Sequence, residues 1–167
     1  NFDFNNKNFI DKSLENFFYF DVILNIFPQA KFINTVRNID DNIFAIFKQS
    51  LSKISWTHSI DDILEYIDNY FTIINYFKKK NPDKIFTIHL EELTNNPEDI
   101  SKKLYSFCNL EWSNEVLNFY TRKDLLISTA SNIQIRDNIK KYDNKKYKPY
   151  KNLLKSFYKN YDWLDLK

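Results

Sequence analysis

Arg37 is the side chain in this sequence best placed to bind an anion. It ends a short apolar run rich in β-branched residues, residues 31–36, and precedes Asn38 and Asp40, either of which can cap a helix. A guanidinium fork beside the free backbone N–H groups of a helix N-terminus is a good phosphate site. The other interpretation is an ion pair between Arg37 and Asp40 or Asp41, and the spacing leaves both open.

Three further polar segments could carry chemistry. Lys12 lies between a short apolar stretch and a helical pattern, where a solvated surface charge is the ordinary interpretation. The run Thr129-Ala-Ser-Asn-Ile-Gln-Ile-Arg136 combines hydroxyl, amide and guanidinium groups, which either line a polar ligand or satisfy their own backbone. The basic run 140–148 interleaves Tyr142 and Tyr147 with lysines, and at a net charge of +2 a solvated loop is favoured over a nucleic-acid site.

Several kinds of site are excluded by what the sequence lacks. With no glycine among 167 residues, neither a Walker loop nor a dinucleotide-binding fingerprint is present. One cysteine and two histidines, Cys108, His58 and His89, give no zinc-ligand spacing, so no metal is expected. Cys108 falls on the apolar side of a predicted helix, which favours a small core residue over a nucleophile.

Charge and hydropathy argue against several classes of partner and location. A net charge of +2 does not indicate a nucleic-acid or membrane-surface protein. No apolar run approaches ~18 residues, and no leader pattern is visible at the start of the sequence. Together with a single cysteine, these features predict a cytoplasmic protein.

The hydrophobic pattern predicts a single α/β domain over residues 1–167. Strands are expected at 31–37 and 84–90, and the regions between and around them read as helices. The expected helices cover 14–27, 38–51, 60–80 and 96–108, with a short one after Ser113 and a last one over 149–161. Helices between strands predict a parallel sheet whose ligands lie at the carboxyl ends of the strands. That edge would carry Lys12, Arg37 and the loop after Leu90.

Five segments in this order resemble the sulfotransferase family, particularly the bacterial enzymes fused to tetratricopeptide repeats and the tyrosylprotein sulfotransferases. The matching segments are Asp11-Lys-Ser-Leu-Glu-Asn16, Phe27-Pro-Gln-Ala-Lys31 with Arg37-Asn38, His89-Leu-Glu-Glu-Leu93 with Asn96-Pro97, Phe107-Cys-Asn-Leu-Glu-Trp112, and Thr129-Ala-Ser-Asn-Ile-Gln-Ile-Arg136.

This resemblance implies a partial three-layer, P-loop-hydrolase-like sulfotransferase fold, in which a short parallel sheet is flanked by helices. It implies transfer of a sulfuryl group from 3′-phosphoadenosine 5′-phosphosulfate to a hydroxyl or amine acceptor, with no metal. By the same resemblance, Arg37 holds the 3′-phosphate of the donor, and Lys12 and Ser131 act at the transferring group. The matching segment that closes over the nucleotide contains three further residues, Asn132, Gln134 and Lys146.

The sequence also departs from the family pattern. Ala45 stands where the family has a second phosphate-binding serine, and Leu90, Leu14 and Tyr147 replace its tyrosine, proline and tryptophan. The family's first strand and glycine-containing phosphosulfate loop are expected to precede this region. We therefore expect the C-terminal part of a sulfotransferase domain that is inactive alone. One alternative is a non-catalytic α/β interaction module. Another is a relative of nucleotide kinases, although the absence of glycine argues against it.

Overall fold

The computed structural model describes residues 9–121, 137–143 and 146–164. Its α-helices are α1 (Phe20–Ile26), α2 (Ile39–Gln49), α3 (Ile60–Lys80), α4 (Leu90–Asn95) and α5 (Pro97–Phe107). Its strands are β1 (Phe32–Val36) and β2 (Ile85–His89). Short 3-10 helices complete the described part: η1 (Asn16–Tyr19), η2 (Ser55–His58), η3 (Pro82–Lys84), η4 (Asn114–Thr121), η6 (Lys148–Phe157) and η7 (Asp162–Leu164).

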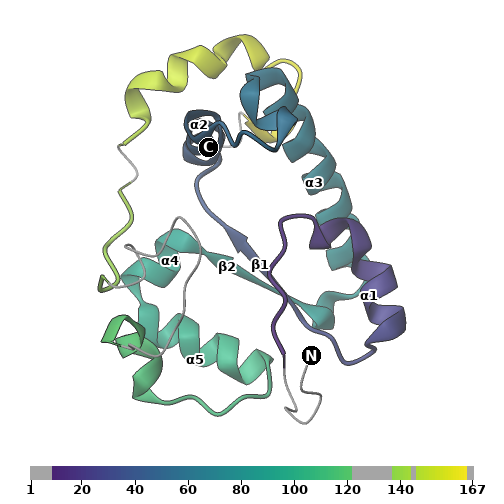
Figure 1. The fold of residues 1–167 in the computed structure, drawn as a ribbon, viewed down its shortest axis with the longest axis vertical. Helices are drawn as coiled ribbons and strands as arrows, with labels where there is room; N and C mark the ends of the chain where they lie inside the picture. The colour runs from purple at the N-terminus through teal and green to yellow at the C-terminus, as the bar shows by residue number, and fades with distance from the viewer. Residues whose placement is uncertain (1–8, 122–136, 144–145, 165–167) are drawn as a thin grey trace.

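The two strands pair in parallel, with Phe32 opposite Ile85 and Val36 opposite His89. Parallel pairing requires the chain to return to the starting end of the sheet between the strands, and α2 and α3 make this crossover. In Figure 1 the strands lie between α1 and the lower part of α3 on one side and α4 and α5 on the other. The fold is therefore mixed α/β with a short parallel sheet flanked by helices, as predicted.

Two helices begin at residues whose side chains cap them, and one of these, Asn38, is a predicted cap. Asn38 caps α2, with its Oδ1 accepting the backbone N–H of Asp41 at 3.2 Å. Ser59 caps α3 in the same way, with its Oγ accepting the N–H of Asp62 at 3.4 Å. Asn109, which follows α5, takes the left-handed conformation with φ of 57°, so asparagine here replaces the usual glycine.

Other elements differ from the sequence-based expectation. The region expected as one helix over 14–27 divides into η1 and α1, because Tyr19 leaves the helical conformation at φ −117° and ψ 17°. The segment after β2 was expected to be a loop and instead forms α4. The segments expected as helices after Ser113 and over 149–161 are the 3-10 helices η4 and η6.

A first hydrophobic cluster, which we call the sheet cluster, lies between α1, α3 and β1. Its core residues are Phe17, Phe20, Ile74 and Phe77. The rings of Phe20 and Phe77 stack at 4.1 Å, and Phe32 of β1 packs against both at 4.6 and 5.1 Å. This contact fixes β1 against α1 and α3.

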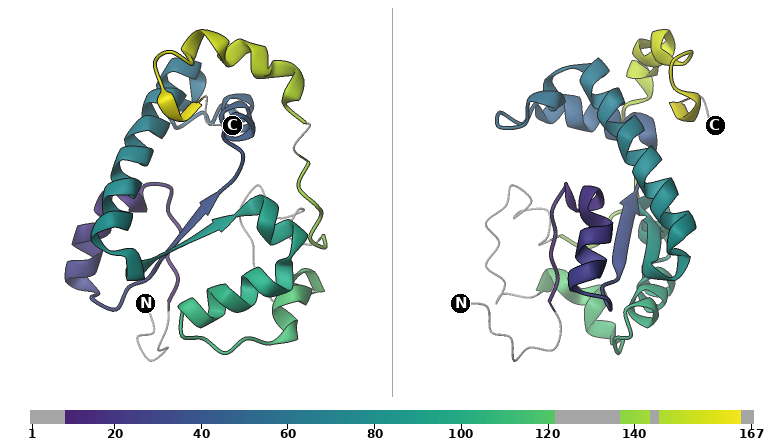
Figure 2. Two further views of the ribbon diagram at one scale, coloured as in Figure 1. Left: turned by 180° about the vertical axis from the view of Figure 1, so that it is seen from behind. Right: turned by 90° about the vertical axis from the view of Figure 1, so that its right-hand side faces the viewer.

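A second cluster, the arm cluster, lies between α2, α3 and the C-terminal arm, which we define as the described residues of 137–164. Its core residues are Ile43, Phe44, Ile63, Leu64, Ile67, Leu154 and Leu164. The arm crosses over α2 at the end of the molecule away from α5, as Figures 1 and 2 show. The arm cluster therefore holds the start of α2, next to β1, beneath the arm.

Helix α3 supplies residues to both clusters and spans the molecule between them. Its length of 21 residues and its many polar positions are those of a helix at a protein surface. Among the described residues, the structure contains no helix long and apolar enough to cross a bilayer.

Candidate functional site

The turn from β1 into α2 places Arg37 at the carboxyl end of the sheet. The side chain of Arg37 is half-buried, and its Nε donates to Oδ1 of Asn42, one turn into α2, at 3.1 Å. This hydrogen bond uses one edge of the guanidinium and fixes its plane. The two terminal nitrogens are the donors that suit a phosphate or carboxylate fork.

The carboxylates nearest to Arg37 in sequence have other partners. Asp40 is fully buried and pairs with Nζ of Lys151 at 2.9 Å. Asp41, with 2% of its surface exposed, accepts a hydrogen bond from the hydroxyl of Tyr142. Among the ion pairs of the described residues, none involves Arg37. Of the two interpretations open from the sequence, the geometry does not pair Arg37 with either aspartate.

Two backbone N–H groups of the same turn are used within the protein. The N–H of Asn38 donates to Oε1 of Glu91 in α4 at 2.6 Å, and the N–H of Asp41 donates to Oδ1 of Asn38. An anion at this end of the sheet would therefore meet the guanidinium of Arg37 rather than these N–H groups. Glu91 and Asp41 thus place two carboxylates at the turn that carries the guanidinium of Arg37.

Lys12 lies in the segment before η1, and its side chain is exposed. Neighbouring residues fold this segment locally, since Nδ2 of Asn16 donates to Oδ2 of Asp11 at 2.6 Å. In Figures 1 and 2 the segment rises past the sheet toward the end at which β1 leads into α2. The ammonium of Lys12 makes no hydrogen bond or ion pair with the residues that the structure describes.

Of the remaining predicted site residues, one lies on the arm and three lie outside the residues that the structure describes. Lys146 is exposed on the arm, with its Nζ 5.4 Å from the ring centre of Tyr147. Ser131, Asn132 and Gln134 lie outside the described residues. The structure thus places Arg37 at the strand ends. That the other predicted residues gather around it stays a prediction.

Sequence reasoning missed three residues that contact the Arg37 turn: Glu91, Asp41 as an acceptor, and Tyr142. Tyr142 also donates its backbone N–H to Oγ1 of Thr94 in α4 at 3.2 Å. Burial and the hydrogen bond to Asp41 raise the pKa of the Tyr142 phenol, so it remains a donor at neutral pH. The signal available was that Glu91 directly follows the predicted strand 84–90, because strand ends of one parallel sheet meet.

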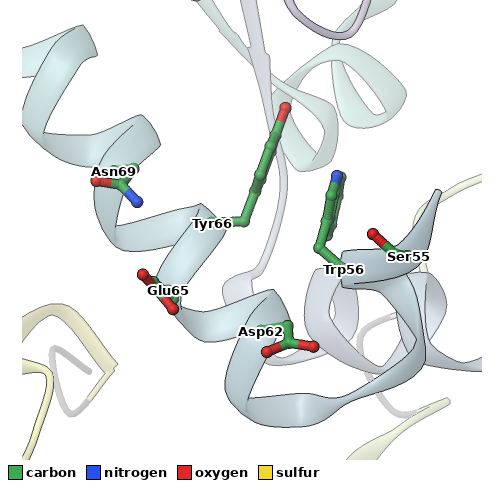
Figure 3. A pocket seen from close by; sticks show the side chains of 6 residues that line it. All are labelled: Ser55, Trp56, Asp62, Glu65, Tyr66 and Asn69. Atoms are coloured by element: carbon green, nitrogen blue, oxygen red, sulfur yellow. The ribbon is translucent and has the colours of Figure 1, made fainter.

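Two hollows of the described surface are lined by residues other than Arg37. The first, about 300 Å³, lies between η2 and α3 and is lined by Ser55, Trp56, Asp62, Glu65, Tyr66 and Asn69. Figure 3 shows the rings of Trp56 and Tyr66 side by side, and they stack at 3.8 Å. Because each ring covers a face of the other, the stack fills part of the space that a flat ligand would need.

The second hollow, about 480 Å³, lies beside α4 at the carboxyl end of β2. It is lined by Leu90, Leu93, Thr94, Phe119 and residues 137–140. It adjoins the strand ends through Thr94, the residue to which Tyr142 donates. Leu90, which replaces the tyrosine of the family pattern, contributes an apolar wall here.

No metal or thiol chemistry is indicated by the described residues. Within them, no three histidine, cysteine or acidic side chains gather as metal ligands. Burial raises the pKa of the Cys108 thiol, with Lys31 acting in the opposite direction, so the thiolate is disfavoured.

Comparison with known proteins adds an independent observation. A family model described as "Sulfotransferase family" matches residues 2–114, a range that includes Lys12, Arg37 and Glu91. A protein of Aquifex aeolicus (strain VF5), named as an uncharacterized protein, is 30% identical over 149 residues. That alignment covers 87% of this chain and 19% of the relative, so the chain spans less than a fifth of the relative's length.

Proposed function

The chain belongs to the sulfotransferase family, and from that premise we propose that it binds the donor 3′-phosphoadenosine 5′-phosphosulfate with Arg37 on the 3′-phosphate. The observation that carries this proposal is the state of Arg37: its plane is fixed by Asn42 and it has no ion-pair partner among the described residues. A guanidinium held in this way is ready to form the two parallel hydrogen bonds that a phosphate accepts.

The reaction proposed is transfer of a sulfuryl group to a hydroxyl or amine acceptor. The donor supplies the sulfuryl group and the phosphate that leaves. An ammonium and a hydroxyl beside that phosphate would stabilise its developing charge, and Lys12 and Ser131 are the residues proposed for this role. Asn132, Gln134 and Lys146 are proposed to close over the nucleotide.

The acceptor class remains a hydroxyl or amine compound in this proposal, without a nucleic-acid or membrane partner. We propose that the complete activity needs a further part of the same domain, since α1 and β1 expose apolar side chains such as Val22 and Ile33. A two-stranded parallel sheet with an exposed face is small for an α/β fold. Cytoplasmic location is part of the same proposal.

A binding titration tests the donor site. We expect adenosine 3′,5′-bisphosphate to bind at least roughly tenfold more tightly than adenosine 5′-monophosphate, because only the former offers the 3′-phosphate to Arg37. The variant Arg37→Ala should remove this preference, and Arg37→Lys should restore only part of it because an ammonium cannot form the fork. Lys48→Ala removes an exposed cation at the other end of α2 and serves as the control.

An activity measurement tests the need for a further part of the domain. The chain alone should transfer no labelled sulfuryl group to a panel of phenols, sugars and amines. Turnover by the chain unaided would contradict this proposal while leaving the donor site at Arg37 in place.

The second candidate is a non-catalytic interaction module that keeps the fold. The observation that favours it is Ala45, half-buried on α2 where the family pattern has a phosphate-binding serine. In that case a folded chain would bind neither nucleotide in the titration. The variant Ala45→Ser separates the two candidates. It should strengthen bisphosphate binding if the chain retains the donor site, and it should have no effect if the chain is an interaction module.

A further inference from the structure

Three elements far apart in the sequence meet at the carboxyl ends of the strands. The first turn of α2 carries Asn38 and Asp41, α4 carries Glu91 and Thr94, and the arm carries Tyr142. Glu91 accepts the backbone N–H of Asn38 at 2.6 Å, which joins α4 to the residue that follows Arg37. Tyr142 then joins the arm to both helices.

Tyr142 makes two hydrogen bonds in different directions. Its backbone N–H donates to Oγ1 of Thr94 at 3.2 Å, and its side-chain hydroxyl donates to Oδ2 of Asp41. Asp41 is 2% exposed and Tyr142 is half-buried, so the acceptor of this second bond is a buried carboxylate, to which a hydrogen bond is strong. The acceptor lies four residues after Arg37, in the first turn of α2.

The rest of the arm is held independently of this hydroxyl. Leu154 and Leu164 are 0% and 1% exposed in the arm cluster, and Lys151 pairs with the buried carboxylate of Asp40. Loss of the Tyr142 hydroxyl therefore leaves the arm attached to α2 and α3. Its effect should be restricted to the geometry of the turn that carries Arg37.

We infer that Tyr142 is a positioning residue for the donor site: it fixes the first turn of α2 between α4 and the arm, and so sets the direction of the Arg37 guanidinium. This inference rests on the proposed function of Arg37. Tyr142 acts through Asp41 and is not assigned a contact with the donor. The selectivity for a 3′-phosphate should therefore depend on a hydroxyl that the phosphate does not touch.

The test compares two nucleotides on matched variants. In Tyr142→Phe, calorimetric titration should show a loss of roughly tenfold in affinity for adenosine 3′,5′-bisphosphate, the size expected for a hydrogen bond to a buried charge. Affinity for adenosine 5′-monophosphate should not change, because that ligand does not use Arg37. Tyr150→Phe removes a hydroxyl from an arm residue that is 53% exposed and should match the wild type in both titrations.

Replacement of the acceptor provides a rescue experiment. Asp41→Asn retains an oxygen to which the Tyr142 hydroxyl can donate, so it should keep most of the selectivity. Asp41→Ala should lose it, and Asp41→Ala combined with Tyr142→Phe should lose no more than the single variants. Thermal unfolding followed by circular dichroism checks that each variant is folded, and Thr94→Val tests the same junction if Tyr142→Phe does not fold.

The outcomes separate the two levels of the proposal. A wild type with no preference for the bisphosphate overturns the proposed function and this inference with it. A preference that persists unchanged in Tyr142→Phe, or a variant that loses affinity for both nucleotides equally, overturns only the role given to Tyr142.

Discussion

The arm cluster and the sheet cluster differ in how completely the described chain covers them. In the arm cluster, Leu154 and Leu164 of the arm pack with residues of α2 and α3 and are almost inaccessible to solvent. Beside the sheet cluster, the apolar surface continues outward, because Val22 and Ile26 of α1 are 53% and 64% exposed. Exposed apolar side chains that adjoin a core are typical of a surface that contacts another molecule or another segment.

This difference shows how the candidate site is supported. The start of α2, which carries the Arg37 turn, belongs to the covered region, since Asp40, Asp41, Ile43 and Phe44 are all buried. The face of β1 that carries Ile33, 43% exposed, belongs to the open region. The turn that carries Arg37 is therefore enclosed by the described residues, whereas this face of β1 is open among them.

The largest expected effect is at the centre of the sheet cluster. Phe77 is 1% exposed and packs on the rings of Phe20 and Phe32, so Phe77→Ala should lower the free energy of unfolding by about 3–5 kcal/mol. Urea denaturation followed by circular dichroism measures it. The neighbouring Tyr76 is 60% exposed, and Tyr76→Ala should cost less than about 1 kcal/mol. Equal losses would mean that the sheet cluster is not a packed core.

Leu154 tests whether the arm is part of the core. Leu154→Ala should lower the free energy of unfolding by about 2–5 kcal/mol, because it leaves a cavity among α2 and α3 side chains. Leu153, which is 64% exposed, gives the control Leu153→Ala with little expected change. Limited proteolysis should cut the arm faster in Leu154→Ala, and an unchanged rate together with unchanged stability would contradict the closure of the cluster by the arm.

The pH dependence of unfolding tests the hydrogen bond between Tyr142 and Asp41, which joins the arm to α2. Burial and the bond to Asp41 raise the pKa of Tyr142 above 10.0, so the folded state holds this proton more tightly than the unfolded chain. The contribution of Tyr142 to the free energy of unfolding is therefore present below about pH 10 and is lost as the pH rises further. Unfolding measured from pH 8 to 11 should show a steeper loss for the wild type than for Tyr142→Phe, with Tyr150→Phe behaving as the wild type. Parallel curves for wild type and Tyr142→Phe would contradict the buried bond.

The smallest effect on stability is expected on the open surface of α1. Val22→Lys should change the free energy of unfolding by less than about 0.5 kcal/mol, because the side chain contributes little to the core. It should, however, reduce self-association at high concentration in sedimentation velocity, since it interrupts an exposed apolar surface. A loss comparable with that of Phe77→Ala would show that Val22 is buried in solution.

Local patterns predicted much of this fold. The apolar runs predicted both strands to within one residue at each end, and the cap at Asn38 predicted the start of α2. The six residues of α4 are too few for a helical period to be visible, and no side chain caps its start. The 3-10 helix η6 was predicted as an α-helix, because the two kinds of helix place apolar residues at similar spacings in a short segment.

The candidate site was predicted only in part, for a different reason. Arg37 is visible from the sequence because its role follows from neighbouring residues. The partners of Asp41 and Asn38 lie 101 and 53 residues away, at Tyr142 and Glu91, and no spacing rule connects such positions. Only the packing of α4 and the arm against α2 brings them together.

One continuous helix, α3, forms the inner wall of both clusters, and this has a consequence for how the molecule opens. Its 21 residues make a rod of ~30 Å with Leu64 near one end and Phe77 near the other. Neither cluster can separate from α3 without exposing apolar side chains on the same rod. In amide hydrogen exchange we therefore expect the middle of α3, around Ile67 and Ile74, to be the slowest region, and both clusters to lose protection in one cooperative step.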